Sequence, residues 1–164
     1  MDSQPPVEIV VARSGGELEL ARALFREYAE QLGVDLCFQG FEAELAALPG
    51  DYGEPRGVLL LALVDGDVAG CCALRPIDDA DYSNAAEMKR LYVRKAFRGF
   101  GLGRQLAEAT LDAARRAGYA CVLLDTLDDK EAARALYEEL GFQEIPPYYH
   151  NPLPGAHYLK VELG

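Results

Sequence analysis

The chain has 164 residues, a formal net charge of −11 and a pI near 4.6. Half of its residues are hydrophobic and 26% are charged, which is typical of one globular domain that occupies residues 1–164. So acidic a chain is a poor partner for nucleic acid, because phosphate backbones need a basic surface. The N-terminus has no signal-peptide pattern and the longest apolar run, 58–64, is too short to cross a membrane, so we expect a cytoplasmic protein without a membrane partner.

Hydrophobic periodicity predicts the element order β-α-α-β-β-β-α-β-α-β-β. Strands are expected at 7–12, 58–64, 68–74, 87–93, 119–126, 142–145 and 158–163, and helices at 18–32, within 35–49, at 102–117 and between 128 and 140. Asp65-Gly66 is a hairpin turn between two of these strands. Asp128, with Glu131 three residues further on, fits the N-cap of the last helix.

The four cysteines predict neither a disulfide framework nor a metal site. None forms C-x-x-C, adjacent cysteines rarely bridge each other, and neither histidine has metal-site spacing with a cysteine. We therefore expect reduced thiols in or near the core, and no metal. These cysteines are Cys37, Cys71, Cys72 and Cys121.

The stretch 87–105 carries the strongest functional signal. An apolar strand runs into the glycine loop 98–103, and a helix follows. Glycines let the backbone come close to an anion, and the first amides of a helix point at it. No acidic residue occurs from 88 to 105, whereas six basic residues do: Lys89, Arg90, Arg94, Lys95, Arg98 and Arg104. This local reversal of charge predicts a polyanionic ligand.

Two known phosphate-binding motifs do not match this loop. A P-loop requires Lys-Ser or Lys-Thr after the glycines, and a dinucleotide fingerprint requires a third glycine where Arg104 stands. The loop does match [RQ]-x-x-G-x-[GA], with Arg98, Gly101 and Gly103 in the fixed positions. A second pattern, A-x-x-L-Y-x-x-x-G-F, covers residues 133–142. With both patterns, the sequence resembles the GNAT N-acetyltransferase family over nearly its whole length.

The resemblance implies a fold, a reaction and a cosubstrate. The fold would be α/β (α+β), with a central mixed, mostly antiparallel, twisted sheet whose central strands splay apart, and about four helices. The reaction would transfer an acetyl group from acetyl-CoA to a primary amine by direct attack in a ternary complex. The acceptor would be a small-molecule amine or a peptide amine, and a homodimer is common in the family. A non-catalytic acyl-CoA-binding sensor or interaction protein on the same fold stays open as the alternative.

The acyl-CoA contacts of the family carry over onto two segments. Leu91, Tyr92 and Val93 would form the strand edge along the pantetheine arm, with the Leu91 N–H as donor to the oxyanion. The loop and helix start would wrap the pyrophosphate with Arg98, Gly99, Phe100, Gly101, Leu102, Gly103 and Arg104. Lys130 stands where the family often has an asparagine that contacts the cofactor, so that contact is lost or replaced by a charge.

The resemblance also implies two residues that move protons. Glu87 would take the ammonium proton, directly or through water, and would share a strand face with Leu91 if the strand has no bulge. The alternative for Glu87 is a solvated carboxylate at the strand end. Tyr137 would protonate the leaving thiolate, and it would lie beside the apolar stripe of its helix rather than in its centre. The alternative for Tyr137 is a half-buried packing residue.

The acceptor itself stays open. In the family, the first two helices and the closing strands build that side of the site. Aromatic and polar residues of these segments could line a pocket or could be core and lid. They are Tyr28, Leu36, Phe38, Phe41, Tyr148, Tyr149, His150 and Asn151.

Overall fold

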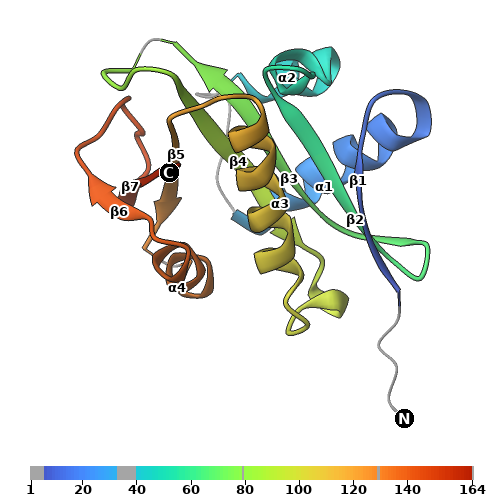
Figure 1. Ribbon diagram of the computed structural model, residues 1–164. Helices are drawn as coiled ribbons and strands as arrows, with labels where there is room; N and C mark the ends of the chain where they lie inside the picture. Colours follow the sequence, from blue (N-terminus) through green and yellow to red (C-terminus); the bar gives the residue numbers. More distant parts are fainter. Residues whose placement is uncertain (1–5, 33–39, 79, 129, 164) are drawn as a thin grey trace.

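The computed structural model describes residues 6–32, 40–78, 80–128 and 130–163. Its elements are β1 (Val7–Val11), α1 (Gly15–Leu32), α2 (Phe41–Ala47), β2 (Val58–Val64), β3 (Asp67–Ile77), β4 (Ala85–Val93), α3 (Leu102–Arg116), β5 (Cys121–Leu127), α4 (Glu131–Glu139), β6 (Gln143–Ile145) and β7 (Ala156–Glu162). Short 3₁₀ turns, η2 (Gly50–Tyr52) and η3 (Lys95–Phe97), precede β2 and α3. The predicted element order is confirmed (Figure 1).

The structure corrects several predictions about where elements begin and end. β3 continues to Ile77 and β4 already begins at Ala85. Asp128 does not cap α4: the N-cap is Lys130, without a side-chain hydrogen bond, and the Asp128 carboxylate contacts His157 instead. Within the expected helix at 35–49, α2 occupies 41–47, and residues 35–39 lie outside the described part of the chain.

The strands form one sheet in the order β1-β2-β3-β4-β5-β7-β6. β4 and β5 are parallel, and the other neighbouring pairs are antiparallel. α3 and α4 cover one face of the sheet, and α1 and α2 cover the other (Figure 1). This is the mixed, mostly antiparallel α+β fold that the sequence predicts.

Each face of the sheet has its own apolar core. Leu106 of α3 packs with Tyr137 of α4 on one face, and Phe25 of α1 packs with Leu45 of α2 on the other. The cysteines in the described residues are buried free thiols, as predicted: Cys71, Cys72 and Cys121. Cys37 lies outside the described residues.

β4 and β5 pair only where they begin. Their parallel register joins residues 85–87 to residues 121–123, although β4 runs on to Val93 and β5 runs on to Leu127. Beyond these pairs the two strands diverge, which opens the sheet at its centre (Figure 1). The splayed central strands that the family resemblance implies are therefore present.

A bulge in β4 lies where the strands diverge. Lys89 and Tyr92 pair with β3 residues only two positions apart, so Arg90 and Leu91 together stand opposite one residue of β3. Arg90 has a φ of 62°, a left-handed backbone that is uncommon for a residue with a side chain. Surrounding contacts must therefore hold this residue in place.

The Arg90 side chain ties the bulge to α2. It is 4% exposed, and its Nε and Nη2 donate to the two carboxylate oxygens of Glu44 at 3.0 Å each. The guanidinium also lies over the rings of Tyr28 and Phe41, 5.8 and 5.3 Å from their centroids. Because a buried charge without its partner is strongly destabilising, Glu44 and Arg90 depend on each other.

Glu44→Ala is expected to lower the free energy of unfolding by about 3–5 kcal/mol, because Arg90 would stay buried without its carboxylate. Glu42→Ala is the matched control on the same helix, since that carboxylate is 69% exposed and meets Arg26 at 3.4 Å. It is expected to cost less than about 1 kcal/mol. Urea unfolding measures both variants, and equal losses would show that this pair does not hold α2 to β4.

Candidate active site

A groove of about 470 Å³ lies beside the end of β4, where this strand is no longer paired with β5. The glycine loop and the start of α3 form one wall, the start of α4 forms the other, and α1 closes one end. We call it the loop groove. Its lining residues are Tyr28, Gln31, Leu91, Tyr92, Val93, Phe97, Arg98, Gly99, Gly101, Leu102, Gly103, Lys130, Glu131, Ala132, Ala133 and Leu136.

The glycine loop forms part of the wall of this groove. Gly99 and Gly101 have φ values of 89° and 78°, which would strain a residue with a side chain. A Cβ built on either glycine would meet no atom within 4 Å, so the space beside the loop is open. Gly101 is also the N-cap of α3 and has no side chain to cap it, which leaves the first amides of the helix for an outside acceptor.

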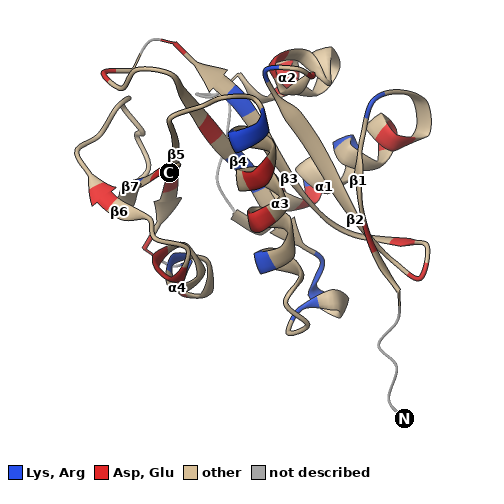
Figure 2. Ribbon diagram, viewed as in Figure 1, with Lys and Arg blue, Asp and Glu red and all other residues tan. Residues whose placement is uncertain are grey.

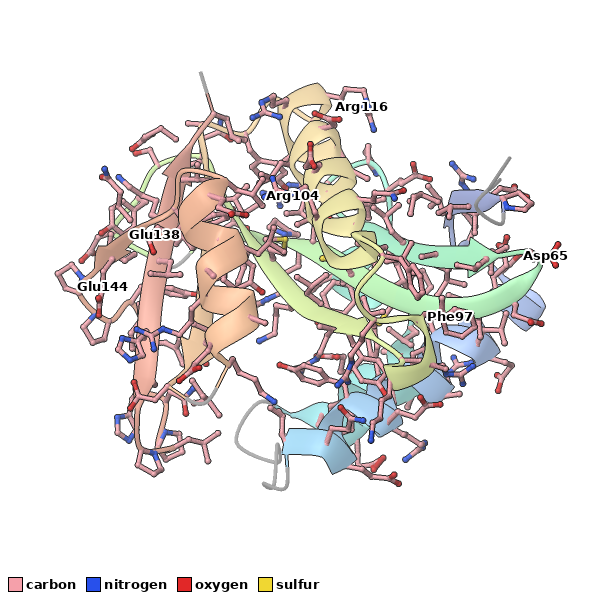
Figure 3. The ribbon with its side chains drawn as sticks, turned by 90° about the horizontal axis from the view of Figure 1, so that it is seen from below. Asp65, Phe97, Arg104, Arg116, Glu138 and Glu144 are labelled. Carbon is pink, nitrogen blue, oxygen red and sulfur yellow. The ribbon has the colours of Figure 1, made fainter. Side chains whose placement is uncertain are left out.

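The predicted cofactor contacts line the loop groove, with the exceptions of Phe100 and Arg104. The Phe100 ring is 64% exposed and does not line the groove. Arg104 reaches from α3 towards α4, where it pairs with Glu139 (Figure 3). The start of α4 forms the facing wall, with Lys130 at its N-cap. The resemblance marks Lys130 as the position of a cofactor contact, but residues 131–133 beside it were not among the predicted cofactor contacts.

Internal ion pairs account for much of the charge reversal between 88 and 105. Four basic residues there pair with carboxylates: Lys89 with Glu87, Arg90 with Glu44, Arg94 with Glu27 and Arg104 with Glu139. Arg98 stays at the groove, where it donates to the Val93 carbonyl at 2.8 Å and to Gln31 at 2.7 Å. Figure 2 shows the cations of this stretch spread over β4, the loop and α3 rather than gathered in one patch. A polyanion is therefore not the only cause of the basic run.

A second cavity, of about 510 Å³, lies under α2 on the other face of the sheet. α2 and η2 form one side, β3 and β4 form the floor, and the loop before β7 closes it. We call it the α2 cavity. Its lining residues are Gly40, Ala43, Glu44, Ala47, Pro49, Gly50, Asp51, Tyr52, Arg75, Ile77, Glu87, Lys89, Tyr148 and Tyr149.

Glu87 lies in the floor of the α2 cavity and is only 1% exposed. Arg75 Nε donates to its Oε1 at 2.8 Å, the Tyr148 hydroxyl donates to its Oε2 at 2.6 Å, and Lys89 Nζ is 3.9 Å from Oε1. Burial raises the pKa of Glu87, but Lys89, Arg75 and the hydrogen bonds outweigh it, so the pKa is lowered overall. Glu87 is thus a buried, ionised carboxylate and not a solvated group at a strand end.

The bulge overturns the expectation that Glu87 and Leu91 share a face of the strand. Glu87 lines the α2 cavity, whereas Leu91 packs against the core under α3 and α4 and lines the loop groove. One extra residue in a strand shifts the alternation of its side chains by one, so residues on its two sides change faces. A group at Glu87 and a group at Leu91 can meet only through the opening between β4 and β5.

A smaller space, of about 50 Å³, lies in that opening. We call it the strand gap. It shares Tyr28 and Lys130 with the loop groove and Lys89 with the α2 cavity, so the three spaces adjoin. Its lining residues are Tyr28, Leu32, Lys89, Arg90, Asp125, Thr126, Leu127, Lys130, Asn151 and Leu153.

Asp125 in β5 is a polar residue of the strand gap that the sequence analysis missed. Its Oδ2 accepts hydrogen bonds from the Tyr149 hydroxyl and from Asn151 Nδ2, the latter at 2.8 Å. The signal in the sequence that could have identified Asp125 was a carboxylate directly after the apolar run of a central strand. The irregular loop before β7 therefore holds a charged side chain in place beside the gap.

The structure places the residues expected on the acceptor side in different locations. Tyr148 and Tyr149 line the α2 cavity, and Tyr28 and Asn151 line the strand gap. Phe41 is core, at 8% exposed, and His150 is exposed. Leu36 and Phe38 lie outside the described residues.

Tyr137 is the buried residue of α4, so it lies in the centre of the packed face and not beside it. It is 7% exposed, and its ring packs edge-on against Phe142 at 5.6 Å between centroids. Burial raises the pKa of Tyr137 well above its usual value, and the charges of Cys72, Tyr28 and Asp125 add to the rise. The phenol therefore keeps its proton at neutral pH.

No group of three or more His, Cys, Asp or Glu side chains in the described residues could hold a metal ion. In the same residues, no helix has the length and apolar character that crossing a bilayer requires.

Comparison with known proteins decides the family. The sequence model of the acetyltransferase (GNAT) family matches residues 19–142. This chain belongs to the GNAT acetyltransferase family. It is an acyltransferase, and the paired loop and helix motifs of its sequence are those of the family.

Individual relatives and a solved structure agree with this family assignment. The GNAT chain is 37% identical to an uncharacterized N-acetyltransferase of Schizosaccharomyces pombe, over 96% of this chain and 95% of that protein. It is 34% identical to human N-acetylaspartate synthetase, over 82% of this chain but only 41% of the synthetase. A putative acetyltransferase from Salmonella typhimurium, solved with its cofactor acetyl-CoA, has the same fold, with a TM-score of 0.67 and 21% identity over 96% of this chain and 94% of that one.

Glu87 is expected to make stability depend on pH. Its folded pKa lies below the ordinary value of 4.5, so ionised Glu87 stabilises the fold above about pH 4.5, and that contribution is lost as the pH falls through the folded pKa. The drop in unfolding free energy between about pH 7 and pH 3, measured with urea, should be larger in the wild type than in Glu87→Gln.

Asp78→Asn serves as the control for removal of a carboxylate, because Asp78 pairs with Arg56 at the exposed surface. The drop in the unfolding free energy of this variant between the two pH values should resemble that of the wild type. A Glu87→Gln protein with the same drop as the wild type would contradict the assignment of this pH dependence to Glu87.

Proposed function

We propose that this GNAT acetyltransferase moves an acetyl group from acetyl-CoA to a primary amine, which attacks the thioester directly in a ternary complex. One observation carries the proposal: the loop groove and the α2 cavity lie on opposite sides of the split between β4 and β5 and adjoin through the strand gap. A thioester held from one side and an amine held from the other would meet in that gap. Such an arrangement supplies proximity and orientation.

Acetyl-CoA would supply the activated acyl group and an anionic diphosphate. The amides of residues 99–103 fit the diphosphate, because the loop is open and the helix dipole lies behind it. Arg98 adds a positive charge at the same wall. Leu91 stands in the bulge, out of the β3 register, which supports its N–H as the donor to the oxyanion.

Glu87 and Tyr137 are the proposed proton carriers. Glu87 is ionised, so it can take the ammonium proton directly or through a water, although its lowered pKa makes it a weaker base than an ordinary carboxylate. Tyr137 keeps its proton at neutral pH and can give it to a basic thiolate. The acid and the base belong to opposite faces of the sheet, as the two substrates would.

Release of free thiol from acetyl-CoA with a panel of primary amines tests the proposal, with Glu87→Gln as the control for the base. Small amines, amino acids and short peptides belong on the panel, and the relative named N-acetylaspartate synthetase adds aspartate to it. Turnover with an amine that is reduced in Glu87→Gln supports the proposal. Tight binding of acetyl-CoA without turnover of any amine would favour the non-catalytic acyl-CoA sensor instead.

Gly101→Glu is expected to raise the dissociation constant for acetyl-CoA at least about a hundredfold, because a carboxylate would stand against the diphosphate. Gly118→Glu is the matched control. Gly118 also has a positive φ, 89°, with no atom within 4 Å of a built Cβ, but it follows the other end of α3. Calorimetric titration measures both variants. Equal weakening in the two would point to backbone strain and away from a binding role of the loop.

Tyr137→Phe is expected to lower kcat about a hundredfold or more while acetyl-CoA affinity stays unchanged, because the thiolate would lose its proton donor. Tyr119→Phe is the control, since that buried hydroxyl donates to the Arg56 carbonyl, away from the three spaces. Steady-state kinetics at saturating substrates measures the difference. Normal kcat in Tyr137→Phe across the active pH range would remove Tyr137 from the mechanism.

A further inference from the structure

Lys89 has a largely buried side chain whose ammonium group makes no hydrogen bond with any described residue. Its side chain is 9% exposed and lines both the α2 cavity and the strand gap. Its ion pair with Glu87 Oε1 has a length of 3.9 Å, beyond hydrogen-bond reach. Both oxygens of Glu87 are already engaged, by Arg75 and by Tyr148. Because this ammonium group has three donors, faces the two spaces and has no acceptor within hydrogen-bond distance among the described residues, Lys89 is placed to bind an anion.

The charges near Lys89 also favour an anion. Arg75 uses its Nε on Glu87, and its two Nη groups make no hydrogen bond with any described residue. Glu44 lines the cavity too, but it is paired with a buried arginine. Asp51 is exposed at the cavity edge. The wall formed by β3 and β4 therefore presents two cations, Arg75 and Lys89, for the one carboxylate of Glu87.

Asp125 supplies the opposite charge at the same opening. It lines the strand gap from β5, and Lys89 lines it from β4. Asp125 Oδ2 accepts from Tyr149 and Asn151, whereas Oδ1 has no hydrogen-bond partner among the described residues. A group that binds carboxylates and a group that binds ammonium thus line one space of about 50 Å³.

We infer that the acceptor is a zwitterionic amino acid, with its α-carboxylate bound by Lys89 and its ammonium bound by Asp125 Oδ1. This inference rests on the proposed function, because it places the reacting nitrogen in the strand gap, next to the loop groove. An α-amino acid carries both charges on one carbon, which suits two groups that line so small a space. The larger α2 cavity then receives the side chain. An amine without the carboxylate leaves the Lys89 ammonium unsatisfied, and such sites reject the incomplete analogue strongly.

The test compares α-amino acids, acidic ones included, with their α-amides and their decarboxylated amines in the thiol-release assay. At least one amino acid should have a kcat/KM about a hundredfold or more above those of its two analogues. Lys89→Met should raise KM for that amino acid about tenfold or more, should raise KM for the amide far less, and should leave KM for acetyl-CoA unchanged. Glu87 keeps Arg75 and Tyr148 in this variant, so the fold should hold.

Lys160→Met is the control for the loss of a lysine charge, because Lys160 lies on β7 and pairs with Glu162. A second readout needs no turnover: with free CoA present, the amino acid should raise the melting temperature of the wild type and of Lys160→Met but not of Lys89→Met. Amides or amines that react as well as the amino acids, or a preference that survives in Lys89→Met, would overturn the inference and leave the proposed function intact. No thiol release with any acceptor would overturn both.

Discussion

The parting of β4 from β5 is the constraint on which the rest of this protein depends. Parallel strands normally pair along their length, and here the register ends after three residues. The bulge at Arg90 directs the second half of β4 away from β5, and the buried pair with Glu44 holds that strained residue in place. Without this pair, the strand could straighten and close the opening. A single ion pair under α2 therefore supports the opening on which the proposed mechanism depends.

The bulge also places the two halves of the proposed chemistry on different faces of the sheet. Leu91 and the glycine loop open towards α3 and α4, and Glu87 opens towards α2. Acetyl-CoA and an amine would then approach from separate cavities and would not compete for one entrance. Such a layout fits direct attack in a ternary complex better than it fits a carrier that only binds acyl-CoA.

In this acidic protein, most basic side chains of the stretch 88–105 form ion pairs with carboxylates of the same chain. Most cations of the stretch 88–105 are neutralised within the chain, so their abundance says less about a ligand than their positions do. The informative cation is Lys89, because it is buried and lacks an acceptor. The informative carboxylate is Asp125, which has one oxygen engaged and one at the gap. Groups that a fold buries without full satisfaction indicate where a ligand completes the structure.

The sequence by itself determined the element order, the glycine loop and the family, because these depend on local patterns: periodicity, the backbone freedom of Gly99 and Gly101, and two short motifs. It could not reveal how the side chain of Glu87 is placed relative to Leu91, since that depends on a bulge that only the pairing of β4 with β3 shows. It could not reveal the partners of Lys89 and Asp125 either, because those contacts join segments far apart in the chain. Only the tertiary structure decided them, through the strand register and the packing of helices that lie far from each other in sequence.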